Sequence, residues 1–167
     1  ASGAFPFPAR AAKSPLAKAR GEAAALPSVA GVRTTHRITL TLLCAWIVLC
    51  CDWLSKPLAE TLLGEHVITN DKPALVWALP LALGACLALS VLVPSRIVAI
   101  GAGMLAGGWS ANLVDRMLFG PVVDFIPFPA GYVGNLADLA ILAGAALLAG
   151  WLAARRTQLG GRVLKRA

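Results

Sequence analysis

Long apolar runs dominate the middle of the chain, and short polar stretches separate them. A transmembrane helix needs about 20 predominantly apolar residues, and runs of this kind are found at residues 38–58, 74–93, 97–114 and 136–154. A helix of a soluble bundle would show a polar face in each run, and none of these runs shows one. The pattern therefore predicts an all-α integral membrane protein with four transmembrane helices.

Composition supports this interpretation, and the charge distribution gives the chain an orientation. Apolar residues make up 58% of the sequence, and the mean hydropathy is +0.75. Most of the 15 basic residues precede the first run or follow the last one, and Arg96 lies in the turn between the second and third runs. Cytoplasmic segments of membrane proteins carry such an excess of Lys and Arg. Both termini are therefore predicted to be cytoplasmic, and the net charge of +7 does not indicate a nucleic-acid partner.

Three regions are predicted along the chain. Residues 1–35 are rich in Ala, Pro, Ser and basic residues and lack an apolar run, so a disordered basic cytoplasmic tail is expected there. A transit peptide has a similar composition, and that alternative stays open. The four-helix domain is expected over residues 36–155, with a small extracytoplasmic β element in the loop after the first helix. A second basic cytoplasmic tail is expected over residues 156–167.

The cysteines do not indicate a metal site. All four lie inside apolar runs, without a C-x-x-C pair and without a histidine at ligand spacing. Buried and inert thiols are the expected outcome for such positions.

Polar residues gather where the predicted helices end on the outer side of the membrane. Each of them alone has an ordinary explanation, such as a helix cap or an interfacial ion pair. Together they predict a functional site, because ionisable residues in membrane segments are rare and usually functional. The residues are Asp52 and Lys56 on the first helix, Asn112, Asp115 and Arg116 on the third, Asp124 in the next loop, and Asn135 and Asp138 at the start of the fourth.

Two of these carboxylates differ from the others. Asp52 has Lys56 four residues away and Asp115 is followed by a basic residue, whereas Asp124 and Asp138 have no basic neighbour in sequence. If two such carboxylates lie close together, repulsion and partial desolvation favour one shared proton between them. The ionised member can then accept a proton from water while the other donates one to a carbonyl oxygen, as in aspartic proteases, without a metal.

The polar blocks resemble those of a known family. The segments "GGWSANLVDRMLFGPVVDFIPF", "NLADLAI" and "DWLSK" are similar to three blocks of the lipoprotein signal peptidases, also called signal peptidase II, which are bacterial intramembrane aspartic proteases. The resemblance covers residues 38–155. It implies that Asp124 and Asp138 are catalytic and that Asp124 activates water. It also implies that the site is ordered, or the substrate held, by Asn112, Asp115, Arg116, Asn135, Asn70, Asp52 and Lys56.

The resemblance further implies a substrate and a location. The family removes signal peptides from diacylglyceryl-modified prolipoproteins, cleaving on the amino side of the lipidated cysteine, and uses no cofactor and no metal. The expected partners are these signal peptides and membrane lipids, with no nucleic acid. The expected protein is a monomer in the bacterial inner membrane, with its site towards the extracytoplasmic side.

The chain departs from the family pattern at several positions. Lys72 and Pro73 follow Asn70 where small residues usually stand, Ala111 replaces a glycine, and Gly134 replaces a phenylalanine. These changes bear on the outer loop and leave two alternatives to an active protease. One is an inactive or divergent relative that binds lipidated signal helices. The other is a metal-dependent lipid enzyme that uses the four aspartates as Mg²⁺ ligands.

Overall fold

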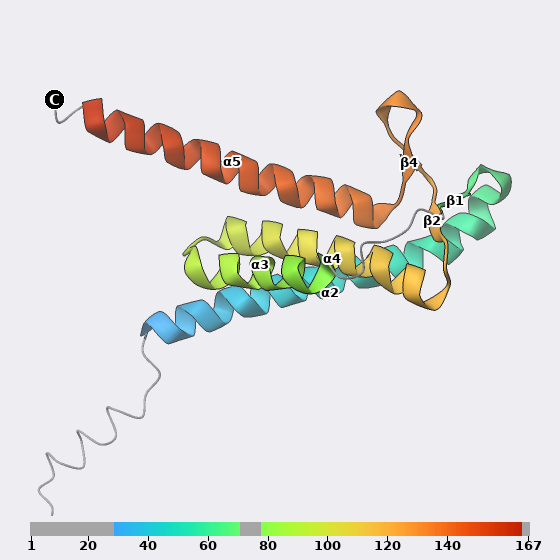
Figure 1. Cartoon of the computed structure of the whole chain (residues 1–167), viewed down its shortest axis with the longest axis horizontal. Helices are drawn as coiled ribbons and strands as arrows, with labels where there is room; N and C mark the ends of the chain where they lie inside the picture. Colours follow the sequence, from blue (N-terminus) through green and yellow to red (C-terminus); the bar gives the residue numbers. More distant parts are fainter. Residues whose placement is uncertain (1–28, 71–77, 165–167) are drawn as a thin grey trace, which may run out of the picture. The chain divides into compact units, whose positions relative to one another are not determined.

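The computed structural model describes residues 29–70 and 78–164, and the side chains of residues 33–70 and 79–158. The chain divides into two units, residues 1–32 and residues 33–167, and the second unit holds all the features considered below. Its α-helices within the described residues are the later part of α2, together with α3, α4 and α5 (Figure 1). Their bounds are Val29–Leu63 for α2, Ala78–Leu92 for α3, Arg96–Leu118 for α4 and Leu136–Leu164 for α5.

Each predicted apolar run overlaps one of these helices, so the helical class is confirmed. Within the described residues, three helices are long and apolar enough to cross a membrane: Arg33–His66, Arg96–Leu118 and Leu136–Gln158. The apolar helix Leu79–Leu92 is shorter, and the beginning of the run predicted over 74–93 lies outside the described residues. Four spans therefore stay a prediction.

The predicted boundaries of the tails are not the ends of the helices. Helix α2 begins at Val29, inside the tail predicted over residues 1–35, and α5 continues to Leu164, beyond the boundary predicted at residue 155. Extending an existing helix by a residue costs far less than starting one. The helices therefore continue into less apolar sequence that the hydropathy pattern had assigned to the tails. Residues 1–28 and 165–167 lie outside the described part of the chain.

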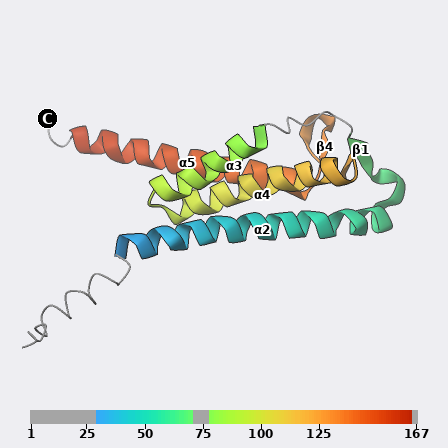
Figure 2. The same cartoon turned by 60° about the horizontal axis from the view of Figure 1, so that its bottom comes forward.

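Helix α4 lies beside the other helices (Figures 1 and 2). Several of its contacts are made by small residues. A Cβ added at Gly103 would lie 2.6 Å from the carbonyl oxygen of Thr41 on α2. A Cβ added at Gly108 would lie 2.5 Å from the carbonyl oxygen of Ala137 on α5. Small residues allow such close approach of backbones, which is typical of helix pairs in membranes. The Gly- and Ala-rich sequence of α4 thus brings α2 and α5 to opposite sides of one helix.

Hydrogen bonds connect α2, α3 and α4 near the start of α4. The hydroxyl of Thr41 lies 2.6 Å from that of Ser90 and donates to the carbonyl oxygen of Ala99 at 3.0 Å. Arg37 donates to the carbonyl oxygens of Ser90 and Val91 at the end of α3, at 2.9 and 3.0 Å. A cation at this position complements the negative end of a helix. These contacts fix one end of the helix group, while the polar residues predicted to form the site lie at the other.

Two small antiparallel sheets lie at that other end. Strand β1 (Ile68–Asn70), in the loop after α2, pairs with β2 (Val122–Asp124) in the loop between α4 and α5. Strand β3 (Ile126–Pro127) pairs with β4 (Val133–Gly134) and forms a hairpin that leads directly into α5. The sheets therefore bring the end of β1, the end of β2 and the beginning of α5 together.

The burial of side chains is the reverse of that in a soluble protein. Leu54, Leu81 and Leu92 are 72%, 70% and 76% exposed, while Asp52 and Ser90 are fully buried. Soluble monomers rarely expose apolar side chains on this scale. Outward-facing leucines and inward-facing polar groups fit a membrane protein.

Candidate functional site

The site is built on the first turn of α5. Asn135 directly precedes this helix, and its side-chain oxygen accepts a hydrogen bond from the backbone N–H of Asp138 at 3.1 Å. In return, Asp138 Oδ2 accepts from the backbone N–H of Asn135 at 3.3 Å. This reciprocal pair is a capping box, which satisfies two N–H groups at the helix start. The capping role considered from the sequence is therefore confirmed, and it fixes the carboxylate of Asp138 at the end of the helix.

Two further side chains bind the Asp138 carboxylate. Asn112 on α4 donates to Oδ1 at 2.9 Å, and the hydroxyl of Tyr132 donates to Oδ2 at 3.1 Å. Together with the backbone N–H of Asn135, three donors from three parts of the chain hold this carboxylate. Asp138 is therefore both a capping residue and the centre of a tertiary network.

Asp124 lies at the end of β2 and joins the same network. Its Oδ1 accepts from Asn135 Nδ2 at 2.9 Å, and its Oδ2 accepts from Asn70 Nδ2 at 3.2 Å. Asn135 is fully buried and binds both carboxylates, and its Nδ2 also donates to Asn112 Oδ1 at 2.8 Å. Asp124, Asp138, Asn112, Asn135, Asn70 and Tyr132 are called the aspartate site below.

The two carboxylates influence each other electrostatically. Burial raises the pKa of the Asp124 carboxyl, and the negative charge of Asp138 raises it further. Hydrogen bonds from Asn70 and Asn135, and the charge of Lys56, act against this rise. A carboxyl group with a raised pKa beside a second carboxylate is the arrangement expected for a pair that shares one proton.

A buried ion-pair cluster supports the aspartate site. The ammonium group of Lys56 on α2 binds Asp52 on the same helix and Asp115 on α4. The other oxygen of Asp52 accepts from the backbone N–H of Ala137, in the first turn of α5, at 2.8 Å. All three side chains are buried. This cluster of Asp52, Lys56 and Asp115 thus connects three helices directly behind the turn that carries Asp138.

An interfacial ion pair, the ordinary explanation for adjacent Asp115 and Arg116, is not what the structure has. Asp115 forms its ion pair with Lys56, and Arg116 donates to the backbone carbonyl of Asn70 at 3.4 Å. Neighbouring residues of a helix do not face the same way. Asp115 therefore points into the helix group, whereas Arg116 reaches β1.

The structure thus brings all the predicted site residues into the aspartate site, the ion-pair cluster or the contact between Arg116 and β1. Sequence reasoning missed Tyr132, which lies in the β3–β4 hairpin and has no periodic relation to the other residues. It also missed that Gly134 leaves room for the Asp138 carboxylate: an added Cβ would lie 2.5 Å from Asp138 Oδ2. The replacement of a usual phenylalanine by Gly134 was the one signal of a changed environment around Asp138.

Cavities lie among the helices in the described part of the chain. One of about 550 Å³ opens beside the ion-pair cluster, with Trp53, Phe119 and Val123 among its lining residues and Lys56 and Asp115 at its polar part. Val123 and Thr69, which also lines it, directly precede Asp124 and Asn70. This cavity is therefore adjacent to the aspartate site.

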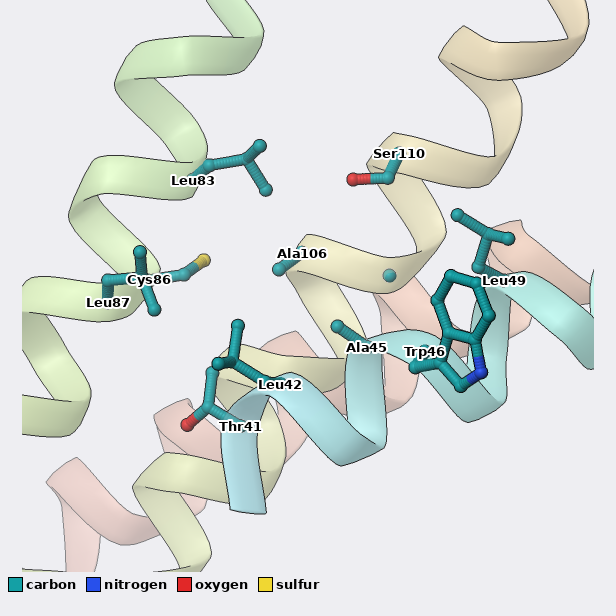
Figure 3. A pocket seen from close by; sticks show the side chains of 11 residues that line it. Thr41, Leu42, Ala45, Trp46, Leu49, Leu83, Cys86, Leu87, Ala106 and Ser110 are labelled. Atoms are coloured by element: carbon teal, nitrogen blue, oxygen red, sulfur yellow. The ribbon is translucent and has the colours of Figure 1, made fainter. Parts of the chain in front are cut away.

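Another cavity, of about 280 Å³, is lined by α2, α3 and α4. Figure 3 shows Leu83 and Cys86 on α3 facing Ala106 on α4, with Thr41 and Ala45 on α2 beside them. None of the predicted site residues lines it. Its apolar lining has the character of a helix packing defect and not of a catalytic site.

The donor set does not suit a metal ion. Among residues 33–70 and 79–158, no three His, Cys, Asp or Glu side chains are grouped to hold one. The position between Asp52 and Asp115, where a cation would bind, is taken by the ammonium of Lys56. The carboxylates of the aspartate site accept hydrogen bonds from amide and hydroxyl groups.

Known proteins share parts of this sequence. Lipoprotein signal peptidases that it resembles include that of Beijerinckia indica subsp. indica, 45% identical over 80 residues (43% of this chain and 48% of that protein). That of Pelotomaculum thermopropionicum is 55% identical over 49 residues (29% of this chain and 32% of that protein). The chain thus spans between about a third and a half of the length of these curated relatives.

Known structures share the fold. A bacterial membrane enzyme solved at 2.3 Å matches with a TM-score of 0.59 and 19% identity, over 71% of this chain and 90% of that one. Another, solved at 1.9 Å, matches with a TM-score of 0.55 and 20% identity, over 67% and 91%. The sequence profile described as signal peptidase (SPase) II matches residues 62–153, more than half of the 167 residues. The chain therefore belongs to the signal peptidase II family.

Proposed function

We propose that this chain is an aspartic endopeptidase that removes the signal peptide from diacylglyceryl-modified prolipoproteins, on the amino side of the lipidated cysteine. The observation that carries the proposal is that Asn135 binds Asp124 and Asp138 at once, at the start of α5. Family membership and the names of the similar proteins supply the reaction and its substrate. The geometry supplies two acidic groups in one hydrogen-bonded network.

The chemistry requires one carboxylate and one carboxylic acid. Burial and the charge of Asp138 raise the pKa of Asp124, which acts in the direction of this state. The ionised group takes a proton from water, and the water oxygen attacks the scissile carbonyl. The protonated group donates to the carbonyl oxygen as negative charge develops there. No metal and no cofactor take part in these steps.

The surroundings suit a substrate that arrives through the bilayer. A signal peptide is an apolar helix and its lipidated cysteine carries acyl chains, so both partition into the hydrocarbon region. The exposed leucines of α2 and α3 would face that region. The cavity of about 550 Å³ adjoins the site and offers an apolar lining for part of the substrate. The distribution of basic residues favours a cytoplasmic location for both termini, with the aspartate site towards the extracytoplasmic side of the inner membrane.

The test is cleavage of a diacylglyceryl-modified precursor by the purified protein in lipid. Asp124→Asn and Asp138→Asn should each lower kcat by about 10²- to 10⁴-fold, because each removes an acid or a base. Glu65→Gln is the matched control, since Glu65 is an exposed acidic side chain with no contact to the aspartate site. Circular dichroism would show that all variants keep their helices. Unchanged cleavage in either aspartate variant would refute the proposal.

The same experiment separates the alternatives. A divergent relative that only binds lipidated signal helices would show no turnover, and its binding would be unaffected by either aspartate substitution. A metal-dependent enzyme would lose activity when a chelator removes divalent ions. The ammonium of Lys56 between Asp52 and Asp115 speaks against that second alternative.

A further inference from the structure

We propose that Tyr132 is a positioning residue whose hydroxyl holds Asp138 as the ionised member of the aspartate pair, so that Asp138 activates water and Asp124 carries the shared proton. This inference rests on the proposed function. It reverses the expectation from the family resemblance, in which Asp124 activates water.

The donors around the two carboxylates differ. Asp138 accepts from Asn112, from the hydroxyl of Tyr132 and from the backbone N–H of Asn135. Hydrogen bonds donated to a carboxylate stabilise its ionised form. Asp138 also lies in the first turn of α5, where the helix dipole favours a negative charge. Both effects favour ionisation of Asp138.

Asp124 is more buried than Asp138 and accepts fewer hydrogen bonds. It lies at the end of a strand, is only 3% exposed and accepts from two side-chain amides. Burial penalises its charged form, and the nearby charge of Asp138 adds to this penalty. The charge of Lys56 acts in the other direction, but Lys56 already binds two carboxylates. The shared proton therefore belongs on Asp124.

Neighbouring charged groups both raise and lower the pKa of Tyr132. Burial raises the pKa of Tyr132, and the charge and hydrogen bond of Asp138 and the charge of Asp124 raise it further. Arg116 lowers it. The phenol is therefore a neutral donor at physiological pH, as its role towards Asp138 requires.

Gly134 makes the contact between Tyr132 and Asp138 possible. A Cβ at position 134 would lie 2.5 Å from Asp138 Oδ2, 3.0 Å from the ring of Phe128 and 3.1 Å from the ring of Tyr132. The hairpin turns through Ala130 and the following glycine, with φ of 64° and 76°, and the two aromatic rings pack with centroids 5.6 Å apart. The missing side chain and the aromatic pair together place the hydroxyl on the carboxylate.

The proton transfers balance with this assignment. A proton of water passes to Asp138, the water oxygen bonds to the carbonyl carbon, and the proton of Asp124 passes to the carbonyl oxygen. When the C–N bond breaks, the proton on Asp138 goes to the leaving nitrogen and one hydroxyl proton of the intermediate returns to Asp124. The products are a carboxylic acid and the free amino group of the cysteine, and both aspartates regain their starting states.

The kinetic test compares Tyr132→Phe with the wild type. This change keeps the ring and removes one hydrogen bond to a charged group, so kcat should fall by about 10- to 100-fold while KM stays nearly constant. Loss of the donor removes one hydrogen bond that stabilises the negative charge on the Asp138 carboxylate, so the acidic limb of the kcat profile should move to higher pH. Gly134→Ala should lower kcat at least as far, because the added methyl would overlap Asp138 Oδ2 as well as the ring of Tyr132.

A spectroscopic test is independent of turnover. Tyr132 is the only tyrosine in the chain, so tyrosinate absorbance reports on this residue alone. Its pKa should lie above the ordinary value in the wild type and fall towards it in Asp138→Asn, with Glu65→Gln as a control that leaves it unchanged.

Outcomes for the two proposals differ. The role of Tyr132 would be overturned if Tyr132→Phe kept the wild-type kcat and pH dependence. It would also be overturned if the phenol pKa were the same in Asp138→Asn as in the wild type. A wild-type protein that does not cleave would instead count against the proposed function, and the titration alone would then decide whether Tyr132 and Asp138 are paired.

Discussion

Replacing Lys56 by methionine would test whether the ion-pair cluster holds the site together. Methionine has a similar length and removes only the ammonium group. Asp52 and Asp115, both buried, would then lose their common cation and face each other as like charges. Asp52 also accepts a hydrogen bond from the backbone N–H of Ala137 in the first turn of α5. A displaced Asp52 side chain would therefore also shift the turn that carries Asp138.

The size of the effect follows from the burial of the three groups. Two charges about 4 Å apart attract by about 4 kcal/mol at an effective dielectric constant of 20. Removing one partner of a buried pair typically costs about 3–5 kcal/mol, because the remaining charge is left uncompensated. Asp52→Asn should cost less, about 1–3 kcal/mol. That change leaves the pair of Lys56 and Asp115 neutral, and its amide oxygen can still accept from Ala137.

Reversible unfolding in mixed micelles with rising detergent denaturant, followed by tryptophan fluorescence, would give both free energies. Lys56→Met should be the less stable variant by about 2 kcal/mol. The triple variant Asp52→Asn, Lys56→Met and Asp115→Asn should regain part of the loss, because no buried charge is left unpaired. A Lys56→Met protein as stable as Asp52→Asn would refute the idea that a buried charge balance, and not merely helix packing, stabilises this region.

Two other predictions concern the aspartate site. Because burial raises the pKa of Asp124, its contribution to stability is complete below the ordinary carboxyl pKa and is lost as pH rises through the higher value. Asn at position 124 does not titrate, so the free energy of unfolding of Asp124→Asn should rise relative to that of the wild type as the pH increases above about 4; a difference that does not change with pH would contradict this. Asn135→Ser keeps a capping oxygen but loses the amide that donates to Asp124. It should lower the free energy of unfolding by about 1–3 kcal/mol, because buried acceptors lose their donor, and it should lose most activity; retained cleavage of the lipidated precursor would show that this amide is dispensable.

The sequence predicted those features that depend on local spacing. Apolar runs located the helices because a bilayer needs long, continuous apolar segments. The pair Asp52 and Lys56 was predicted because residues four apart on a helix face the same side. The capping of α5 by Asn135 and Asp138 was considered for the same reason, since their three-residue spacing suits a capping box.

Features set by tertiary packing were not predictable in this way. Asp115 binds Lys56, which is 59 residues away in sequence, and not the adjacent Arg116. Only the close approach of α2 and α4, which Gly103 permits, brings these groups together. Tyr132 reaches Asp138 through a hairpin whose φ angles are positive at Ala130 and at the glycine that follows. Neither hydrophobic periodicity nor charge spacing carries information about such a turn.

Asn135 shows why the structural and functional interpretations of the site are not alternatives. Its side-chain oxygen caps α5, which any Ser, Thr, Asp or Asn could do. Its side-chain nitrogen reaches Asp124 on β2, which a hydroxyl or carboxylate could not do in the same geometry as a donor to two oxygens. The helix start fixes the orientation of the amide, and the amide then fixes the position of Asp124 relative to Asp138. The cap is thus the means by which a loop carboxylate and a helix carboxylate acquire a defined separation, and the stability of the helix end becomes a condition for the chemistry.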